Sequence, residues 1–374
     1  MYGPCPTDIT CRLTNQAGFA PSVAPLGALS FKLHKELAEA HGGREKWGYC
    51  KSTCTSLTYD SETAVGGSGE DWMRDGSSRA NAAGAYESAE GDGPAWLTRA
   101  KGANLEIISQ DGSVAQVDPK RLCQFLLGES MARGVKLHHP GKVISVSKDM
   151  RDELASVRIA FADGTETDIP CTRLVITAGP WTPMVFATLF PSATTKIPIS
   201  SLAGYSLLVK SPRWSKEHET KGCHAVFATD DLGFSPEIFS RLDEEVYITG
   251  LNSTKIPLPE LSTDAKIQPE QISTLKEAAK NMLGLPGGKD DLQILRESLC
   301  FRPVTSSGRP IISKVPDSKL GGIKTRDGGE GGVFLAAGHG AWGISQSLGS
   351  GKVLTELIEG QLTSVNIQSL TLQV

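Results

Sequence analysis

The segment Val333-Phe-Leu-Ala-Ala-Gly-His-Gly-Ala-Trp-Gly-Ile344 is the most informative stretch of this sequence. Its apolar start predicts a buried strand, and residues 345–359 predict a helix. Between the two, Gly338, Gly340 and Gly343 have the spacing Gly-x-Gly-x-x-Gly of dinucleotide-binding turns. Glycine permits positive φ angles and a close approach of backbone to ligand, and the first amides of a helix can bind phosphate. Taken literally, the segment matches a turn that contacts a nucleotide cofactor, but the bare pattern is a weak signal, and a ligand-free strand-to-helix turn is the alternative.

The same segment does not fit the opening unit of a nicotinamide-binding domain. Such a unit needs a second strand that ends in an acidic residue about 20 residues further on. Residues 364–368 are the single candidate for that strand, and they end without an acid. Nor is Gly349-Ser-Gly351-Lys352 a phosphate loop, because Gln346 and Val353 occupy the places of its first glycine and its Ser or Thr. We expect these glycines to form a small-residue helix face that packs closely on a strand.

The composition excludes several broad classes of protein. The 374 residues include 38 basic and 42 acidic side chains, a net charge of −4, which provides no positive surface for nucleic acid or anionic membranes. With 39% hydrophobic and 21% charged residues, the chain is typical of globular proteins. Apolar runs such as residues 184–190 are far shorter than the ~20 residues of a membrane helix, so we predict no membrane span. A small-molecule substrate remains as the expected partner.

The N-terminus and the cysteines predict a cytoplasmic protein without a metal site. The first residues, Met-Tyr-Gly-Pro-Cys-Pro, are neither basic nor apolar, unlike a secretory signal. Eight cysteines are too few in a chain of this length for a disulfide scaffold. Cys50 and Cys54 have no second Cys or His pair nearby, so we expect no zinc there.

Strands and helices are mixed along the sequence, which predicts an α/β or α+β fold. Leucines recur every three or four residues over 26–40 and predict a helix, and Asp118 before Pro119 predicts a capped helix start. Asp163 and Gly164 predict a hairpin turn. Residues 60–93 are rich in small residues and typical of a loop. We expect strands at 142–147, 156–161, 173–177 (a buried strand), 205–209, 245–249 and 333–337, and a further helix at 268–284.

Three further segments carry a family resemblance. They are Leu299-Cys-Phe-Arg-Pro-Val-Thr-Ser-Ser-Gly-Arg-Pro-Ile-Ile-Ser313, Arg173-Leu-Val-Ile-Thr-Ala-Gly-Pro-Trp-Thr182, and Val117-Asp-Pro119 with its helix. Together with the glycine segment, they resemble the D-amino-acid-oxidase-like FAD-dependent oxidoreductases, which include glycine oxidase, monomeric sarcosine oxidase and the fructosyl-amine oxidases. Fungal members of this kind carry a Gly-His-Gly-x-Trp-Gly-Ile-Ser loop like that of residues 338–345. The resemblance covers residues 17–360 and implies FAD as the cofactor.

The resemblance also implies which residues contact FAD. The glycine loop would run along the ribityl chain and the ring edge, where backbone amides stabilise the negative charge of reduced flavin. The strand at 173–177 would pass beneath the adenosine half, and the strand after the capped helix would lie on the adenine side. Trp342 is expected to act by packing. The expected cofactor contacts are Ala17, Gly18, Val143, Ala178, Gly179, Trp181, Cys300, Gly338, Gly340, Trp342, Gly343 and Ile344.

Arg302 and His339 are the expected catalytic residues. By resemblance to glycine oxidase, Arg302 would clamp a substrate carboxylate, for which a guanidinium fork is suited. A structural ion pair or a cofactor contact is the alternative. His339 would face the flavin or the substrate, or else hydrogen-bond the backbone. Cys300 lies where sarcosine and fructosyl-amine oxidases bind flavin covalently, but we expect a buried thiol and a non-covalent flavin.

The implied reaction is oxidation of a C–N bond in an amine or amino acid. Hydride would pass to flavin N5, the imine would hydrolyse, and oxygen or another acceptor would reoxidise the flavin. The lysine with which sarcosine oxidase activates oxygen has no match near residues 247–250, so oxidase and dehydrogenase both stay open. The alternatives are a tailoring oxidoreductase of a natural-product pathway and a catalytically impaired relative that acts as a binding protein.

The implied architecture is a Rossmann-like FAD-binding domain interleaved with an antiparallel-sheet substrate domain. We expect the FAD-binding domain at 1–44, 117–199 and 299–374, and the substrate domain at 45–116 and 200–298. Members of the family open with a Gly-x-Gly-x-x-Gly βαβ unit, which needs ~30 residues. Only 14 residues precede Asn15, where Asn-Gln-Ala-Gly resembles the segment after that unit. We therefore expect an N-terminally truncated FAD-binding domain that binds FAD weakly.

Overall fold

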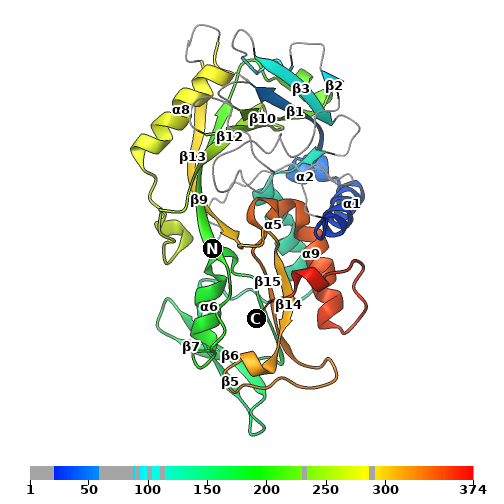
Figure 1. The fold of residues 1–374 in the computed structure, drawn as a ribbon, viewed down its shortest axis with the longest axis vertical. Coiled ribbons are helices and arrows are strands. Elements are labelled where there is room, and N and C mark those ends of the chain that lie inside the picture. Colours follow the sequence, from blue (N-terminus) through cyan, green and yellow to red (C-terminus); the bar gives the residue numbers. More distant parts are fainter. Residues whose placement is uncertain are drawn as a thin grey trace.

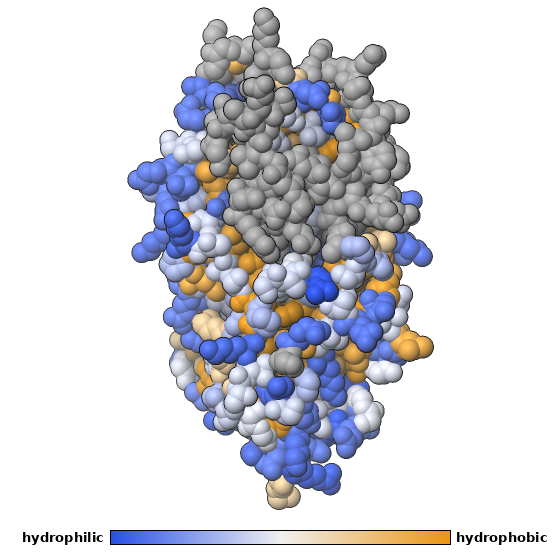
Figure 2. All heavy atoms as spheres, in the orientation of Figure 1, coloured by the Kyte–Doolittle hydropathy of each residue, from blue (hydrophilic) through white to orange (hydrophobic). Residues whose placement is uncertain are grey.

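The computed structural model is elongated, with a large sheet at one end and two small sheets at the other (Figure 1). It describes residues 21–58, 87–88, 93–98, 103–109, 114–229, 234–285 and 291–373. Helices and strands are mixed, which confirms the predicted fold class. Ala17, Gly18 and the expected N-terminal truncation lie outside these residues, as does most of the loop expected at 60–93. On the face shown in Figure 2, apolar and hydrophilic side chains are interspersed over the described part. No helix within the described ranges is long and apolar enough to cross a bilayer.

The large sheet comprises nine strands in the described residues, in the order β13-β9-β12-β11-β10-β1-β3-β2, with β4 paired to β1. All of these pairs are antiparallel except β1 with β10, which corrects the expected antiparallel sheet at that point. The strands are β1 (Cys50–Thr58), β2 (Glu87–Ser88), β3 (Asn104–Ser109), β4 (Ala115–Gln116), β9 (Ser200–Lys210), β10 (Cys223–Thr229), β11 (Glu237–Ser240), β12 (Glu245–Ser253) and β13 (Gln293–Val304).

Helix α8 (Pro269–Leu283) covers one face of the large sheet (Figure 1). The buried side chains of Leu275 and Met282 belong to the same core cluster as Tyr205 and Leu207 of β9. Residues alternate between the two faces of a strand, so Gly204 and Ser206 face the other way. The main apolar core thus lies under α8. The opposite face of β9 carries Gly204 and Ser206 together with Leu208, which is buried in a second apolar cluster with Phe239 and Tyr247.

The other end of the molecule has two three-stranded sheets. Helix α6 (Thr182–Leu189) joins them, because its Phe186 is buried in one cluster with Leu154 and Ile176. The first sheet, in the order β14-β15-β8, and the second, in the order β5-β6-β7, consist of β14 (Ile311–Val315), β15 (Gly332–Ala337), β8 (Arg173–Ile176), β5 (Gly141–Lys148), β6 (Leu154–Phe161) and β7 (Glu166–Pro170).

Strand β8 is more exposed than the sequence indicates. Ile176 is 3% exposed, but Val175 is 39% exposed and Arg173 lies at the surface. Leu174 and Ile176 pack at the cluster of Phe186, and residues alternate between the two faces of a strand, so Arg173 and Val175 point the other way, where Arg173 pairs with Glu359 at 3.1 Å. The expectation of a buried strand at 173–177 is therefore wrong for its outward residues.

Helices α1 (Ala24–His41) and α9 (Gly343–Ile358) pack against each other, and α9 lies on β14 and β15. The helix predicted at 26–40 is confirmed, and Gly42 ends it in the left-handed conformation. A Cβ at Gly349 of α9 would lie 2.9 Å from the carbonyl oxygen of α1 residue Leu26. Within the small-residue segment 349–352, Gly349 therefore packs on a helix and not on a strand, while Gly351 and Lys352 are exposed. This close approach explains why the buried stripe of α1 includes small and polar residues: Leu26, Gly27, Ser30, His34 and Ala38.

The other predicted elements are confirmed with small changes of their bounds. Asp118 caps α5 (Pro119–Ala132), since its Oδ1 accepts a hydrogen bond from the Arg121 amide at 2.9 Å. Gly164 adopts a φ of 82° in the turn between β6 and β7. Residues 364–368, the candidate for a further strand, do not form a strand. The remaining short helices are α2 (Gly43–Trp47), α7 (Lys216–Thr220) and the 3₁₀ turns η1 (Gly179–Trp181), η2 (Ser262–Asp264), η3 (Asp317–Lys319), η4 (Gly340–Trp342) and η5 (Gln368–Leu370).

Candidate functional site

The two glycine segments singled out in the sequence meet at one edge of a sheet. Strand β8 leads into η1 and α6, while β15 leads into η4 and α9. The two strands are parallel neighbours, with Leu335 opposite Ile176, so both turns follow their carboxyl ends. In open α/β sheets, ligands bind outside the carboxyl ends of the strands. The structure therefore brings residues 178–181 and 338–344 together where a cofactor would bind.

The backbone of these turns adopts conformations that favour glycine. Gly179 has a φ of 54°, Gly338 of 84° and Gly340 of 57°. A Cβ at Gly338 would lie 2.7 Å from Thr305 Cγ2, whereas a Cβ at Gly179 would meet no atom within 4 Å. Gly343, the last member of the motif, has a φ of −55° and needs no glycine for its own conformation. Two of the three glycines in the motif are thus required by backbone geometry.

The start of α9 is directed to the same edge and is firmly held. Its N-cap residue, Trp342, makes no side-chain capping hydrogen bond, and the first amides of a helix have no acceptor within the helix. Ile344 lies in this first turn, and its carbonyl accepts hydrogen bonds from His34 Nε2 at 3.0 Å and Ser347 Oγ at 2.8 Å. The bond from His34 ties α9 to α1, and the bond from Ser347 is internal to α9. The first turn of α9 is therefore a fixed group of donors suited to an anion or to a reduced flavin.

The imidazole of His339 contacts α9. Its Nε2 and the Oγ of Ser350 lie 2.9 Å apart in a hydrogen bond. Burial lowers the pKa of His339 to about 4, so the ring is neutral at pH 7. A neutral ring in this place fixes the glycine turn to the helix. A direct role of His339 toward flavin or substrate stays a prediction.

Three of the expected adenosine-side contacts line one cavity. Val143, Ala178 and Trp181 surround a space of about 430 Å³, within the size range of small-molecule sites. The indole of Trp181 is fixed, since its Nε1 donates to the carbonyl of Pro259 at 2.7 Å. This cavity adjoins the turn η1. The residues that the sequence proposed on the adenine side are therefore gathered beside the glycine turns.

Arg302 lies on β13, the strand that contacts both η1 and η4. The residue is only 3% exposed. Its Nη1 donates to Asn252 Oδ1 at 2.7 Å, and its Nη2 to Thr249 Oγ1 at 3.5 Å. Both acceptors are neutral side chains of β12. The positive charge of Arg302 is thus held next to the glycine turns and shielded from solvent, where electrostatic attraction is stronger than in water.

Gly204 of β9 makes room for this arginine. It lies opposite Cys300 in the pairing of β9 with β13. A Cβ at Gly204 would overlap the guanidinium of Arg302 and lie 2.9 Å from Asn252 Oδ1. Glycine here lets the guanidinium lie flat on the strand. Cys300 itself is 4% exposed, which agrees with a buried thiol, and the expected absence of a covalent flavin link stays a prediction.

Sequence reasoning missed Gly204, Thr249 and Asn252, as well as His34. The first three lie in the region 200–255, which follows no motif, and their contact depends on the register of three strands. His34 offered a weak signal, because it is a polar residue at helical spacing from Leu26 and Ala38. Its role becomes visible only when α9 is packed against α1.

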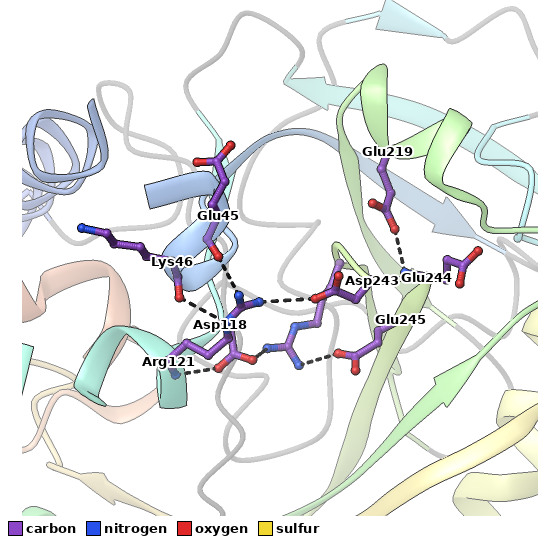
Figure 3. Close-up of polar contacts among 9 residues, drawn as sticks. Glu45, Lys46, Asp118, Arg121, Glu219, Asp243, Glu244 and Glu245 are labelled. Atoms are coloured by element: carbon purple, nitrogen blue, oxygen red, sulfur yellow. Dashed lines mark hydrogen bonds and ion pairs between the residues drawn. The ribbon is translucent and has the colours of Figure 1, made fainter. Parts of the chain in front are cut away.

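A network of charged side chains fixes α5 to the large sheet (Figure 3). Arg121 Nη1 pairs with Asp243 Oδ2 at 3.3 Å, and Asp118 Oδ2 pairs with Arg241 Nη2 at 2.9 Å. Arg241 also pairs with Glu245 at 3.6 Å. The cavity between these groups measures about 20 Å³, room for about one water molecule. The network therefore has a structural role and is not a ligand site.

Glycine turns at parallel strand ends, next to a buried arginine on a second sheet, are typical of a site for a nucleotide cofactor. Residues 11–357 match the family described as DAO, FAD dependent oxidoreductase. The chain belongs to this family, and FAD is the family's cofactor.

Curated relatives and solved structures agree with this assignment. A Schizosaccharomyces pombe protein named "Putative oxidoreductase" is 26% identical over 94% of this chain and 82% of its own length. TDA3 of Saccharomyces cerevisiae, named likewise, is 27% identical over 74% of this chain; the match spans only 54% of TDA3. Iminodiacetate oxidase from Chelativorans sp. BNC1 has a similar fold, with a TM-score of 0.69, 19% identity and coverage of 98% of this chain and 88% of that one. Glycine oxidase from Geobacillus kaustophilus also has a similar fold, with a TM-score of 0.68 and 18% identity, and the match covers 96% of this chain and 86% of that one.

The residues present fit FAD. The positive-φ glycines and the first amides of α9 offer backbone donors, and the cavity at Val143 and Trp181 offers apolar walls. In addition, Ser30 Oγ and Gln346 Oε1 are buried without a hydrogen-bond partner among the described residues. Buried polar atoms are almost always paired, so these two indicate that a further polar group belongs beside α1 and α9.

Proposed function

We propose that this protein oxidises a C–N bond of an amine or amino acid that it binds through a carboxylate. One observation carries the proposal: Arg302 is buried on the strand that contacts both glycine turns, with its guanidinium supported by neutral side chains. A guanidinium binds a carboxylate through two parallel hydrogen bonds. The names of two structural neighbours, iminodiacetate oxidase and glycine oxidase, support a substrate of this kind.

Bound FAD supplies the acceptor for the hydride equivalent that leaves the substrate carbon. The residues of the chain bind, orient and exclude water. Arg302 holds the carboxylate and thereby fixes the position of the neighbouring carbon atom. The first amides of α9 stabilise negative charge at the cofactor edge. His339 is neutral and bonded to Ser350, so we assign it the task of fixing the turn and leave proton removal to the solvent.

The test is anaerobic mixing of the FAD-loaded protein with iminodiacetate, glycine and other amino acids, and with diethylamine as an amine without a carboxylate. The expected result is loss of the visible flavin absorbance with at least one amine that bears a carboxylate, and none with diethylamine. Bleaching by diethylamine alone, or by no member of a panel of primary and secondary amino acids, would contradict the proposal. A cytoplasmic location and the domain boundaries given above stay predictions.

A further inference from the structure

Cys50 and Cys223 lie side by side, away from the candidate active site. Cys50 begins β1 and Cys223 begins β10, and these strands run parallel with Ser52 opposite Cys223. The two cysteines are 4% and 1% exposed, and both are free thiols. Cys50 is two residues from Ser52 on β1 and so lies on the face that Cys223 shares, and both cysteines belong to one buried cluster. The two thiols are therefore neighbours that are not joined by a disulfide.

A guanidinium covers Cys50 from the solvent side. Arg44 belongs to α2, and its Nη1 donates to Cys50 Sγ at 3.2 Å. Its Nη2 donates to the carbonyl of Glu219 at 3.2 Å, and the carboxylate of Glu219 in turn accepts from the Glu244 amide at 2.6 Å (Figure 3). Arg44 is itself exposed, so the sulfur beneath it is one side chain away from water. The cation is held in place by bonds that do not involve the thiol.

These contacts divide the roles of the two sulfurs. The hydrogen bond from Cys223 and the guanidinium of Arg44 lower the pKa of Cys50 to about 6, against the opposing effect of burial. The same hydrogen bond between the two side chains, together with burial, raises the pKa of Cys223. At neutral pH, Cys50 is thus a thiolate and Cys223 a thiol. A thiolate next to a second thiol is the arrangement of redox-reactive cysteines.

We propose that Cys50 and Cys223 form a peroxide-reactive pair in which Arg44 holds the attacking sulfur of Cys50 and Cys223 closes a disulfide between β1 and β10. In the first step the Cys50 sulfur attacks hydrogen peroxide. The S–O bond forms, the O–O bond breaks, and hydroxide leaves and takes a proton from water. In the second step the Cys223 sulfur displaces hydroxide from the Cys50 sulfenic acid, which leaves as water with the Cys223 proton. Two electrons pass from the two sulfurs to one peroxide.

Two other described cysteines, both less buried than this pair, provide an internal comparison. Cys123 is exposed on α5, yet desolvation of its sulfur and the carboxylate of Asp118 raise its pKa. Cys171 is half-buried, and burial raises its pKa as well. Exposure alone would make Cys123 react first, whereas thiolate character makes Cys50 react first. The two explanations therefore predict opposite orders of oxidation.

The experiment exposes the reduced full-length protein to one equivalent of hydrogen peroxide and maps its peptides without reduction. We expect a Cys50–Cys223 linked peptide to form before Cys123 is modified. In Cys223→Ala, dimedone should label Cys50. In Arg44→Gln the disulfide should form about twofold more slowly at pH 7, because a rise of about one unit from a pKa of about 6 lowers the thiolate fraction of Cys50 from about 0.9 to about 0.5. Cys123→Ala is the matched control and should leave the rate unchanged.

Oxidation of Cys123 while Cys50 and Cys223 stay reduced would overturn the proposal. So would a disulfide rate in Arg44→Gln equal to that of the unaltered protein. Circular dichroism of each variant shows whether it folds. If a variant does not fold, the peptide map of the unaltered protein still decides between the two orders of oxidation.

Discussion

The two regions that meet at the candidate site are built differently. Around η1 and η4 the chain presents its backbone, through glycines with positive φ and the uncapped start of α9. On β9, β12 and β13 it presents side chains, with Arg302 supported by Asn252 over Gly204. Backbone groups recognise what all members of a cofactor class share, while side chains select a substrate. Substitutions in the first region should therefore decide whether FAD binds, and substitutions in the second should decide which molecule binds next to it.

The largest effect is expected from Gly340→Val. A β-branched residue at a φ of 57° is strained by at least about 1–2 kcal/mol, and its side chain occupies the space of the cofactor backbone contact. FAD binding, measured by quenching of flavin fluorescence during titration, should be abolished. Gly351→Ala is the matched control, because a Cβ there meets no atom within 4 Å and no positive φ is involved. Unchanged FAD affinity in Gly340→Val would show that this turn does not hold the cofactor.

The next largest effect is expected from Arg302→Met, which removes the charge and keeps much of the side-chain length. Each hydrogen bond to a charged group contributes about 1.5–3 kcal/mol, so carboxylate affinity should fall about 100-fold or more. Calorimetric titration of the FAD-loaded protein with acetate measures this, with acetamide as the neutral control ligand. FAD content should stay the same. If Arg302→Met loses FAD instead, the arginine belongs to the cofactor site, and the contrast between the two regions fails.

A smaller effect is expected from Gly204→Ala. The added methyl group displaces the guanidinium from the strand and from Asn252, so acetate affinity should fall about tenfold, the equivalent of about one hydrogen bond. Gly351→Ala again serves as the control for the same chemical change. Asn252→Ala should have an effect of similar size. Acetate binding that is equal in Gly204→Ala and in the unaltered protein would mean that Arg302 does not need this position.

The smallest effect concerns pH and His339. Its pKa of about 4 in the folded protein lies below the value of about 6.5 expected when unfolded. The unfolded chain therefore binds more protons between these values, and the free energy of unfolding falls as the pH is lowered from about 6.5 to 4. His339→Gln keeps a hydrogen-bonding group near Ser350 and should make this decrease shallower. Urea unfolding at several pH values tests it; His224, whose pKa burial also lowers to about 4, leaves a residual slope in the variant. If the free energy of unfolding depends on pH equally in His339→Gln and in the unaltered protein, the lowered pKa assigned to His339 is wrong.

The sequence indicated the backbone region well and the side-chain region poorly. Local signals such as the glycine triplet at 338–343 and the Asp118 cap act within a few residues, and the structure contains both. Arg302 is supported by Asn252 and Gly204, which lie 50 and 98 positions before it in the chain. Only the pairing of the strands brings these residues close. In the same way, the parallel pairing of β1 with β10 is what places Cys50 beside Cys223. Such contacts depend on register, and a single sequence does not specify register across distant strands.

The most direct test is a crystal structure of the FAD-loaded protein soaked with acetate. The account predicts flavin and its phosphates at the turns η1 and η4 and at the start of α9, with acetate bound by both terminal nitrogens of Arg302. A cofactor bound away from these turns, or acetate bound elsewhere while Arg302 keeps its hydrogen bonds to Asn252 and Thr249, would contradict it.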